Sequence, residues 1–397
     1  MKNKFLLLSL TATIFISCES DDTADIIIND NSVTTVNNTT TTGENPATTV
    51  NLNGLYSADL TLDPNIEYII TGPVLMASGT TLTIPAGMTV NAQPIGVNAY
   101  IAIQQGAKIN ANGTAANPII FTSNATAPSS GNWGGLVLLG RAPINSTADG
   151  STEIATSEVG ALAYGGNSSD DDSGILRYVR IEYAGGAIDG NAELNGLSVY
   201  AVGTGTTIDY VQIFEGSDDG FEFFGGTVNA SHLVVVNAED DSIDWTEGFT
   251  GTLTDVYVQQ DAGKPHDSGF ECDGFNTDFS LVGSSVSKPT INNVTAIGDG
   301  DSGRAFRLRA GTQGIFTNVV VTNFQRGFVI EDDVNNLPTS AGVTSGDLTA
   351  TNVSFAASVT TPYTGTAPQA DFIKGDASAA TGTAIGTWGA GWTRGIQ

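Results

Sequence analysis

The stretch EDDSIDWTEG, residues 239–248, places five carboxylates around two bulky apolar residues. Ile243 and Trp245 alternate with Asp244, and this period of two is typical of a β-strand that buries one face and exposes the other. Clustered carboxylates bind hard cations or serve as a general acid and a general base. The outward face of this segment is therefore the first candidate for chemistry in the chain.

Two other segments, FEFF from residue 221 and FECD from residue 270, repeat the alternation. If such strands stack, the inward positions form two apolar rows: Phe221, Ile243, Phe270, Phe306 and Phe328, and Phe223, Trp245, Cys272, Leu308 and Ile330. The outward positions form one polar row of Glu222, Asp244, Glu271 and Arg307. Like charges that face one another on paired strands are destabilising, so this row needs a cation, an arginine or protonated carboxyl groups.

More acids flank the polar row, and the chain contains only two His. Clusters of oxygen ligands without His or Cys are typical of Ca²⁺ sites. The residues that we expect to hold Ca²⁺ are Asp219, Glu222, Asp241, Asp244, Asp267, Glu271 and Asp273. The alternative interpretation, which the sequence leaves open, is that these acids end turns and keep the surface solvated.

Catalysis by the same residues is a second hypothesis. Carboxylates on neighbouring strands lie about 5 Å apart, near the separation in retaining glycosidases, but any stacked row has this spacing. A lyase would combine Ca²⁺ with a basic residue that removes a proton. The catalytic candidates are Glu222, Asp244, Glu271, Arg307 and Lys264. Charge balance is the alternative role for the two basic residues, so the sequence assigns no catalytic residue.

The strands that carry these residues belong to a repeat. An apolar-x-x-Val unit occurs in LRYVRI at 176, IDYVQI at 208, LTDVYV at 253, INNVTA at 291 and FTNVVV at 316. Its base period of 22 to 25 residues, lengthened by insertions, is typical of a solenoid, and the alternation inside each unit indicates strands. The sequence predicts an all-β fold, with a parallel β-helix over residues 51–347 and a last coil and C-terminal cap over 348–397.

Insertions at 140–172 and 259–290 interrupt the repeat. Binding residues are concentrated on loops, so we expect ligand specificity to reside in these two insertions. Trp388 and Trp392, near the end of the chain, are expected to plug the C-terminal opening of the β-helix. Without such a plug, the last coil would expose unpaired strand edges.

Three segments, TTLTIPAGMTVNA from residue 80, GNWGGLVLLGRAPIN from 131 and TWGAGWTRG from 387, resemble parts of bacterial secreted or lipid-anchored proteins. Those proteins have the right-handed parallel β-helix of the pectin-lyase fold. The resemblance covers residues 55–397 and implies this fold and a surface location, but no particular activity. Polygalacturonase-type hydrolases of the fold carry Gly-His-Gly and Arg-x-Lys motifs, and neither motif occurs in this sequence.

The N-terminus has the layout of an export signal. Lys2 and Lys4 precede an apolar run from Phe5 to Ile16, which is too short to span a membrane as a helix. Residues 1–17 are therefore expected to be a lipoprotein signal peptide. The Ile-Ser-Cys junction resembles a lipobox, in which Cys18 would receive lipid chains such as palmitate. A plain secretory signal is the alternative.

The residues after this junction predict where the protein resides. CESDD, which starts at Cys18, resembles the export signal of Bacteroidota-type surface lipoproteins and implies lipid anchoring on the outer face of the outer membrane. Residues 18–50 are rich in Thr, Asn and Asp, which predicts a flexible tether. If Cys18 carries lipid, Cys272 is the other thiol of the chain, so an internal disulfide is excluded.

The charge balance limits the partners. The chain has 14 Lys and Arg against 42 Asp and Glu, which excludes a nucleic-acid ligand because phosphate binding requires clustered cations. We expect a non-catalytic surface lipoprotein that binds a glycan, a partner protein or cations through the acidic face of the β-helix. Two alternatives stay open: a polysaccharide lyase or hydrolase assisted by Ca²⁺, and a structural or adhesive rod.

Overall fold

The computed structural model describes residues 48–150, 152–188, 193–301, 303–332 and 337–397. These residues fall within one compact unit, Ser32–Gln397. Cys18, the expected signal peptide and nearly all of the expected tether lie outside the described residues, so their assignments stay predictions. Within the described ranges, no helix is long and apolar enough to cross a membrane.

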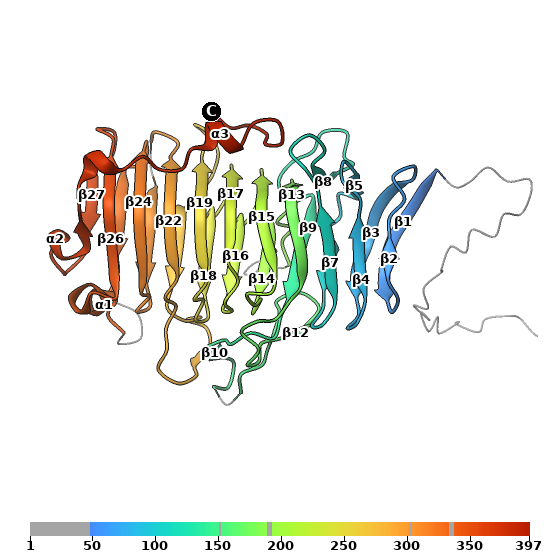
Figure 1. Cartoon of the computed structure of the whole chain (residues 1–397), viewed down its shortest axis with the longest axis horizontal. Coiled ribbons are helices and arrows are strands. Elements are labelled where there is room, and N and C mark those ends of the chain that lie inside the picture. Colours follow the sequence, from blue (N-terminus) through green and yellow to red (C-terminus); the bar gives the residue numbers. More distant parts are fainter. Residues whose placement is uncertain (1–47, 151, 189–192, 302, 333–336) are drawn as a thin grey trace, which may run out of the picture. The chain divides into compact units, whose positions relative to one another are not determined.

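Parallel strands stack along a right-handed β-helix (Figure 1), and their pairings form three ladders. The prediction of an all-β parallel β-helix is confirmed. One ladder, called the first ladder below, carries the candidate site. It begins with the ends of β1 (Thr49–Tyr56) and β3 (Glu67–Met76) and continues through β6 (Gly96–Ile103), β9 (Trp133–Leu139), β14 (Leu197–Tyr200), β16 (Phe221–Phe224), β18 (Ile243–Thr246), β20 (Ser268–Asp273), β23 (Arg304–Arg309), β25 (Arg326–Ile330) and β27 (Thr361–Thr364).

The other two ladders consist mainly of long strands that bend at a corner. These strands are β13 (Gly174–Glu182), β15 (Thr207–Phe214), β17 (Ala230–Val236), β19 (Thr252–Gln259), β22 (Thr290–Ile297), β24 (Gly314–Thr322) and β26 (Leu348–Phe355). The ladders are completed by β1 (Thr49–Tyr56), β2 (Leu60–Thr61), β3 (Glu67–Met76), β4 (Thr81–Ile84), β5 (Thr89–Ala92), β7 (Lys108–Asn112), β8 (Ile119–Ser123) and β28 (Ile373–Lys374).

One residue with left-handed backbone makes the corner in each long strand. The corner residues have φ between 48° and 61° and are Tyr178, Tyr210, His232, Asp255, Asn293, Asn318 and Asn352. Asn and Asp tolerate this conformation better than other side chains that carry a Cβ. The other three corner residues have aromatic rings that stack on one another. The ring of Tyr210 lies parallel to those of Tyr178 and His232, with centroids 4.3 and 3.9 Å apart.

The core is filled by the inward side chains of the first ladder and the facing strands. The register pairs Phe221 with Ile243, Ile243 with Phe270 and Phe270 with Phe306, which confirms the predicted apolar row. The rings of Phe270, Phe306 and Phe328 stack with centroids 4.7 and 4.2 Å apart. Cys272 is a fully buried free thiol in the second row, as predicted for a core residue.

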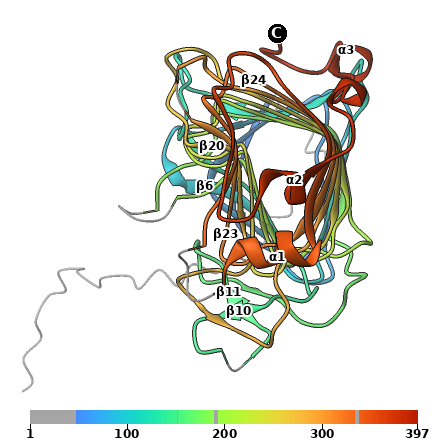
Figure 2. The same ribbon diagram turned by 90° about the vertical axis from the view of Figure 1, so that its left-hand side faces the viewer.

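Helices close the C-terminal end of the β-helix, as Figure 2 shows. The helices are α1 (Thr339–Ser345), α2 (Gln369–Phe372), a short η1 (Ala377–Ala379) and α3 (Ile385–Trp388). Of these, α1 and α2 lie over the end. The ring of Phe372 packs on Phe328 with centroids 4.9 Å apart, so it covers the core there.

The prediction that Trp388 and Trp392 plug this end is wrong. Residues 380–397, called the C-terminal strap below, run back along the corners of the long strands (Figure 1). Trp392 is fully buried against the edges of Tyr178 and Tyr210, with ring centroids 5.7 and 6.0 Å apart. Phe372 covers the C-terminal opening in place of the two tryptophans. The strap is held along the side of the β-helix by Gln212, which donates a hydrogen bond of 2.6 Å to the carbonyl of Arg394.

Replacing Trp392 tests whether the C-terminal strap belongs to the cooperative fold. Trp392→Ala removes a buried ring, so we expect the free energy of unfolding to fall by about 3 kcal/mol in chemical denaturation. Trp388→Ala is the matched control and should have a smaller effect, because this ring is partly exposed. Equal stability of the Trp392→Ala variant and the wild type would contradict this account of the strap.

Candidate functional site

The predicted polar row exists on the outward side of the first ladder. In the strand register Glu222 pairs with Asp244, Asp244 pairs with Glu271, and Glu271 pairs with Arg307. Turns that precede β16 and β18 bring further acids beside this row. We call six of these residues the acidic face: Asp218, Asp219, Glu222, Asp240, Asp241 and Asp244.

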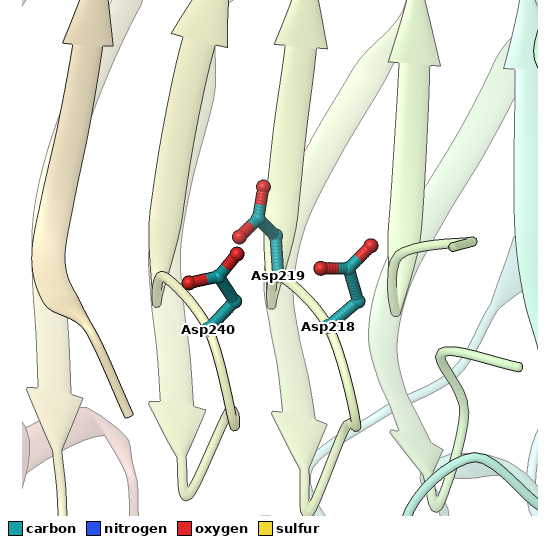
Figure 3. A group of neighbouring side chains, drawn as sticks. All are labelled: Asp218, Asp219 and Asp240. Atoms are coloured by element: carbon teal, nitrogen blue, oxygen red, sulfur yellow. The ribbon is translucent and has the colours of Figure 1, made fainter. Parts of the chain in front are cut away.

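The turns stack as closely as the strands do. Figure 3 shows Asp218 and Asp219 on one coil beside Asp240 on the next. Asp219 Oδ1 accepts a hydrogen bond of 2.9 Å from the backbone N–H of Asp241, its equivalent one coil later. Gly220 permits this approach, because a Cβ there would lie 2.5 Å from the carbonyl oxygen of Ser242. The acids on successive coils are therefore forced together by the backbone.

Arginines neutralise one end of the row. Glu271 Oε2 lies 2.7 Å from Nη1 of Arg307, and its Oε1 lies 2.6 Å from Nη2 of Arg309. Arg309 also binds Asp273, with Nε 2.7 Å from Oδ1. Burial raises the pKa of Asp273 to about 6, although the charge of Arg309 opposes this shift. Charge balance on this coil is therefore supplied by the protein itself.

The acidic face has no such partners. Among the described residues, none of its six carboxylates forms an ion pair within 4.0 Å. Burial and then the charge of Asp240 raise the pKa of Asp218 to about 8. Burial, followed by repulsion from neighbouring carboxylates, also raises the pKa of Asp219, Glu222, Asp241 and Asp244 well above the usual range. Without a cation, the six groups cannot all be ionised at neutral pH.

Three buried oxygen atoms at this face, on Asn195, Asp241 and Asp244, lack hydrogen-bond partners in the described part of the chain. Asn195, 1% exposed, donates from Nδ2 to Glu222 Oε2 at 2.7 Å, and its own Oδ1 has no partner. Asp241, 3% exposed, has an unpartnered Oδ1. A buried polar atom without a partner is destabilising by about 1–3 kcal/mol, so the described residues alone do not satisfy this face.

The carboxylates are close enough to coordinate an ion. Four triads have ligand oxygens within 4.8 Å of one another: Asp218, Asp219 and Asp240; Asp219, Glu222 and Asp244; Asp240, Asp241 and Asp267; and Asp241, Asp244 and Glu271. An all-oxygen donor set of this kind fits Ca²⁺ or a similar hard cation. The triads contain every residue expected to hold Ca²⁺ except Asp273.

Two members of these triads, Asp218 and Asp240, are not in the ligand set predicted from the sequence. Asp218 and Asp240 lie at equivalent positions of SDDG and EDDS, two segments 22 residues apart. The repeated Asp-Asp pair is the signal that could have identified them, because equivalent turns of a solenoid stack.

The basic candidates for catalysis are both paired with acids. Lys264 Nζ lies 2.9 Å from Glu215 and does not contact the polar row. Arg307 binds Glu271 and also Glu331, at 3.2 Å from Nε to Oε1. Neither residue is therefore a free base beside the acidic face.

The two insertions meet beside the acidic face. Strand β10 (Ser146–Thr147) of the first insertion pairs with β21 (Ser280–Leu281) of the second insertion. Within the first insertion, β11 (Ala155–Thr156) pairs with β12 (Ala163–Tyr164). Glu247 joins them, because its carboxylate accepts hydrogen bonds from Tyr164 at 2.8 Å and from Asn276 at 3.1 Å. Burial raises the pKa of Glu247 to about 7.

Comparison with known proteins gives one family. Residues 54–393 match the model of the family described as pectate-lyase like beta helix domain. A comparison with curated proteins gives no match. Among solved structures, the chain is similar to the catalytic unit of thermostable GH87 alpha-1,3-glucanase from Streptomyces thermodiastaticus strain HF3-3, at 11% identity and a TM-score of 0.35. The match covers 79% of this chain and 62%, less than two thirds, of the glucanase unit. Such a likeness carries no information on activity.

The raised pKa values predict how stability depends on pH when divalent cations are removed by a chelator. Asp218 has a pKa of about 8 in the folded protein and about 3.9 when unfolded, so the folded state binds more protons between these values. The contribution of Asp218 to stability should therefore be greatest below pH 4 and should be lost as the pH rises to about 8. The slope is at most about 1.4 kcal/mol per pH unit for one group.

Asp218→Asn should remove this group's share of the slope. We expect the variant to unfold at higher denaturant concentration than the wild type at pH 8, and to differ little from it at pH 4. Asp63→Asn is the control, because Asp63 is exposed in the turn between β2 and β3, outside the acidic face and both insertions, and its carboxylate accepts hydrogen bonds only from Asn65 among the described residues. Parallel pH profiles for Asp218→Asn and the wild type would contradict the account.

Proposed function

The chain belongs to the pectate-lyase-like β-helix family, and from this premise we propose that it is a carbohydrate-binding protein whose acidic face holds a divalent cation such as Ca²⁺. One observation carries the proposal. The six carboxylates of the acidic face form no ion pair within 4.0 Å among the described residues, while Glu271 and Asp273 on the next coil are neutralised by Arg307 and Arg309. A bound cation supplies the missing charge.

A cation also gives the face a way to bind sugars. Protein-bound Ca²⁺ takes six to eight oxygen ligands, so a site built from three carboxylates leaves positions for oxygens of a ligand. Sugar hydroxyls can occupy such positions, and so can a uronate carboxylate, which the face would repel if no cation were bound. The proposed recognition is therefore through oxygen coordination and hydrogen bonds.

The proposal extends to the place where the protein acts. Lipidation at Cys18 would anchor the chain in the outer membrane, and a tether over residues 18–50 would let the β-helix stand away from the lipid on the cell surface. Support for this location comes from the lipobox and the CESDD segment of the sequence alone.

Hydrolysis of a glycan is the second candidate function. The observation in its favour is that several carboxyl groups lie in one cluster. Asp218, with a pKa raised by burial to about 8, lies in a triad with Asp219 and Asp240. A pair of acids with different protonation states can divide the roles of general acid and general base. A lyase is less well supported, because Lys264 and Arg307 are both paired.

A glycan panel separates these functions. The purified protein is incubated with neutral and uronic polysaccharides with Ca²⁺ or with a chelator, and both retention and the release of reducing or unsaturated ends are measured. We expect retention of at least one polymer, weakened about tenfold or more by the chelator, and no released ends. The double variant Asp219→Asn/Asp244→Asn should lose retention, because it removes two charged ligands of one triad.

Asp63→Asn is the matched control for this panel and should bind like the wild type, because Asp63 is exposed and lies outside both insertions. Released ends that disappear in the double variant would replace the binding function with hydrolysis. No retention and no release on any polymer would contradict both functions and favour a structural rod.

A further inference from the structure

The C-terminal strap lies over one histidine of the corners, His232. This residue forms the corner of β17, and its ring stacks on Tyr210 of β15, with centroids 3.9 Å apart. Trp388, at the end of α3 in the strap, meets the same imidazole edge to face, with centroids 5.0 Å apart. His232 therefore lies between the body of the β-helix and the strap that runs along it.

Each ring nitrogen of His232 faces a carboxylate. Nδ1 lies 2.8 Å from Oδ1 of Asp209 on the preceding coil, and Nε2 lies 3.9 Å from Oδ2 of Asp255 on the following coil. Because Asp209 accepts a hydrogen bond from Nδ1, this nitrogen carries a hydrogen, and in a neutral imidazole Nε2 is then an acceptor. A neutral His232 thus turns a lone pair toward the carboxylate of Asp255, whereas a protonated His232 turns an N–H toward it.

Asp255 also holds the strap. Its Oδ1 accepts a hydrogen bond of 3.0 Å from Oγ1 of Thr383, and the same hydroxyl accepts one of 3.2 Å from the indole N–H of Trp388. Thr383 is buried. The acid that faces His232 with one oxygen is therefore the acid that fastens residues 383–388 with the other.

Titratable or charged side chains of three strands surround His232. They are Asp209 and Tyr210 of β15, Asp255 of β19, and Arg177 of β13, whose Nε lies 3.3 Å from Oδ2 of Asp209. Burial by itself would raise the pKa of Asp209, but hydrogen bonds from His232 and Ser231 bring it below its ordinary value. Burial raises the pKa of Tyr210, so this phenol is neutral.

Protonation of His232 balances the charge beneath the strap. Two carboxylates and one arginine leave a net charge of −1 when His232 is neutral, and no net charge when it is protonated. The strap brings no compensating charge, because Arg394, its charged side chain, binds Glu182 at 2.9 Å. Covering a net charge removes it from water at a cost in free energy, and a charged imidazole is also attracted to the face of the Tyr210 ring. The strap should therefore bind more tightly when His232 carries a proton.

We propose that His232 is a proton-operated latch of the C-terminal strap, closed when the imidazole is protonated and releasing residues 381–388 when it is neutral. The sign follows from linkage. Because the closed form binds the proton more tightly than the open form, closure is favoured below the ordinary titration range of histidine, about pH 6.5, and weakens as the pH rises through it. Release uncovers the stacked rings of Tyr178, Tyr210 and His232. The latch is independent of the proposed function.

Hydrogen exchange of the full chain, followed by mass spectrometry and corrected for intrinsic exchange rates, tests the latch. We expect the amides of residues 381–388 to be about tenfold less protected at pH 8 than at pH 5.5, the factor that a difference of one unit in proton affinity gives. The amides of Arg394 and Gln397, which donate to Gln212 and Gln259, are the internal control and should show no such step.

His232→Asn is the matched variant, because asparagine already forms the equivalent corner with left-handed backbone at Asn293, Asn318 and Asn352. An asparagine side chain does not titrate, so the step in protection should vanish. His266→Asn, at the other histidine of the chain, should retain the step. Absence of a step in the wild type would overturn the latch, and so would an equal step in the wild type and in His232→Asn.

Discussion

Repulsion between stacked carboxylates is the interaction on which the rest of the structure depends. A parallel β-helix places equivalent residues of successive coils about 4.8 Å apart, so any acid that recurs with the repeat must face its own copy. Glu222, Asp244 and Glu271 recur in this way. The protein resolves the repulsion with arginines at Glu271 and leaves it unresolved at the other two positions.

The surrounding structure can tolerate this repulsion because packing elsewhere is extensive. Stacked rings of Phe270, Phe306 and Phe328 fill the core directly behind the first ladder. The C-terminal strap clamps the corners of several coils, with Trp392 fully buried at one end. On the side of the acidic face, Glu247 ties the two insertions together. The acids are thus held on a rigid support, which is what a preformed cation site requires.

Strand identity and register were predictable because the side-chain period of a strand and the repeat period of a solenoid are both visible in the sequence. Alternation in IDWT fixed which side chains point inward, and this placed Glu222, Asp244, Glu271 and Arg307 in one row. The second partner of Glu271, Arg309, depends on how long side chains fold over the ladder and has no sequence signal. The junction of the two insertions was equally hidden, since Asn145 binds the carbonyl of Gly274, 129 residues away, outside any period. The direction of the strap could not be predicted, because buried tryptophans fit an end or a flank equally well.

The most direct test of the central claim, that the acidic face is a cation site, is a crystal structure of the protein grown with Mn²⁺, with diffraction data collected at the manganese absorption edge. The account predicts an anomalous peak between the carboxylates of Asp219, Glu222 and Asp244. It would be contradicted by well-ordered carboxyl groups that bond to one another as protonated acids, with no anomalous peak anywhere on the acidic face.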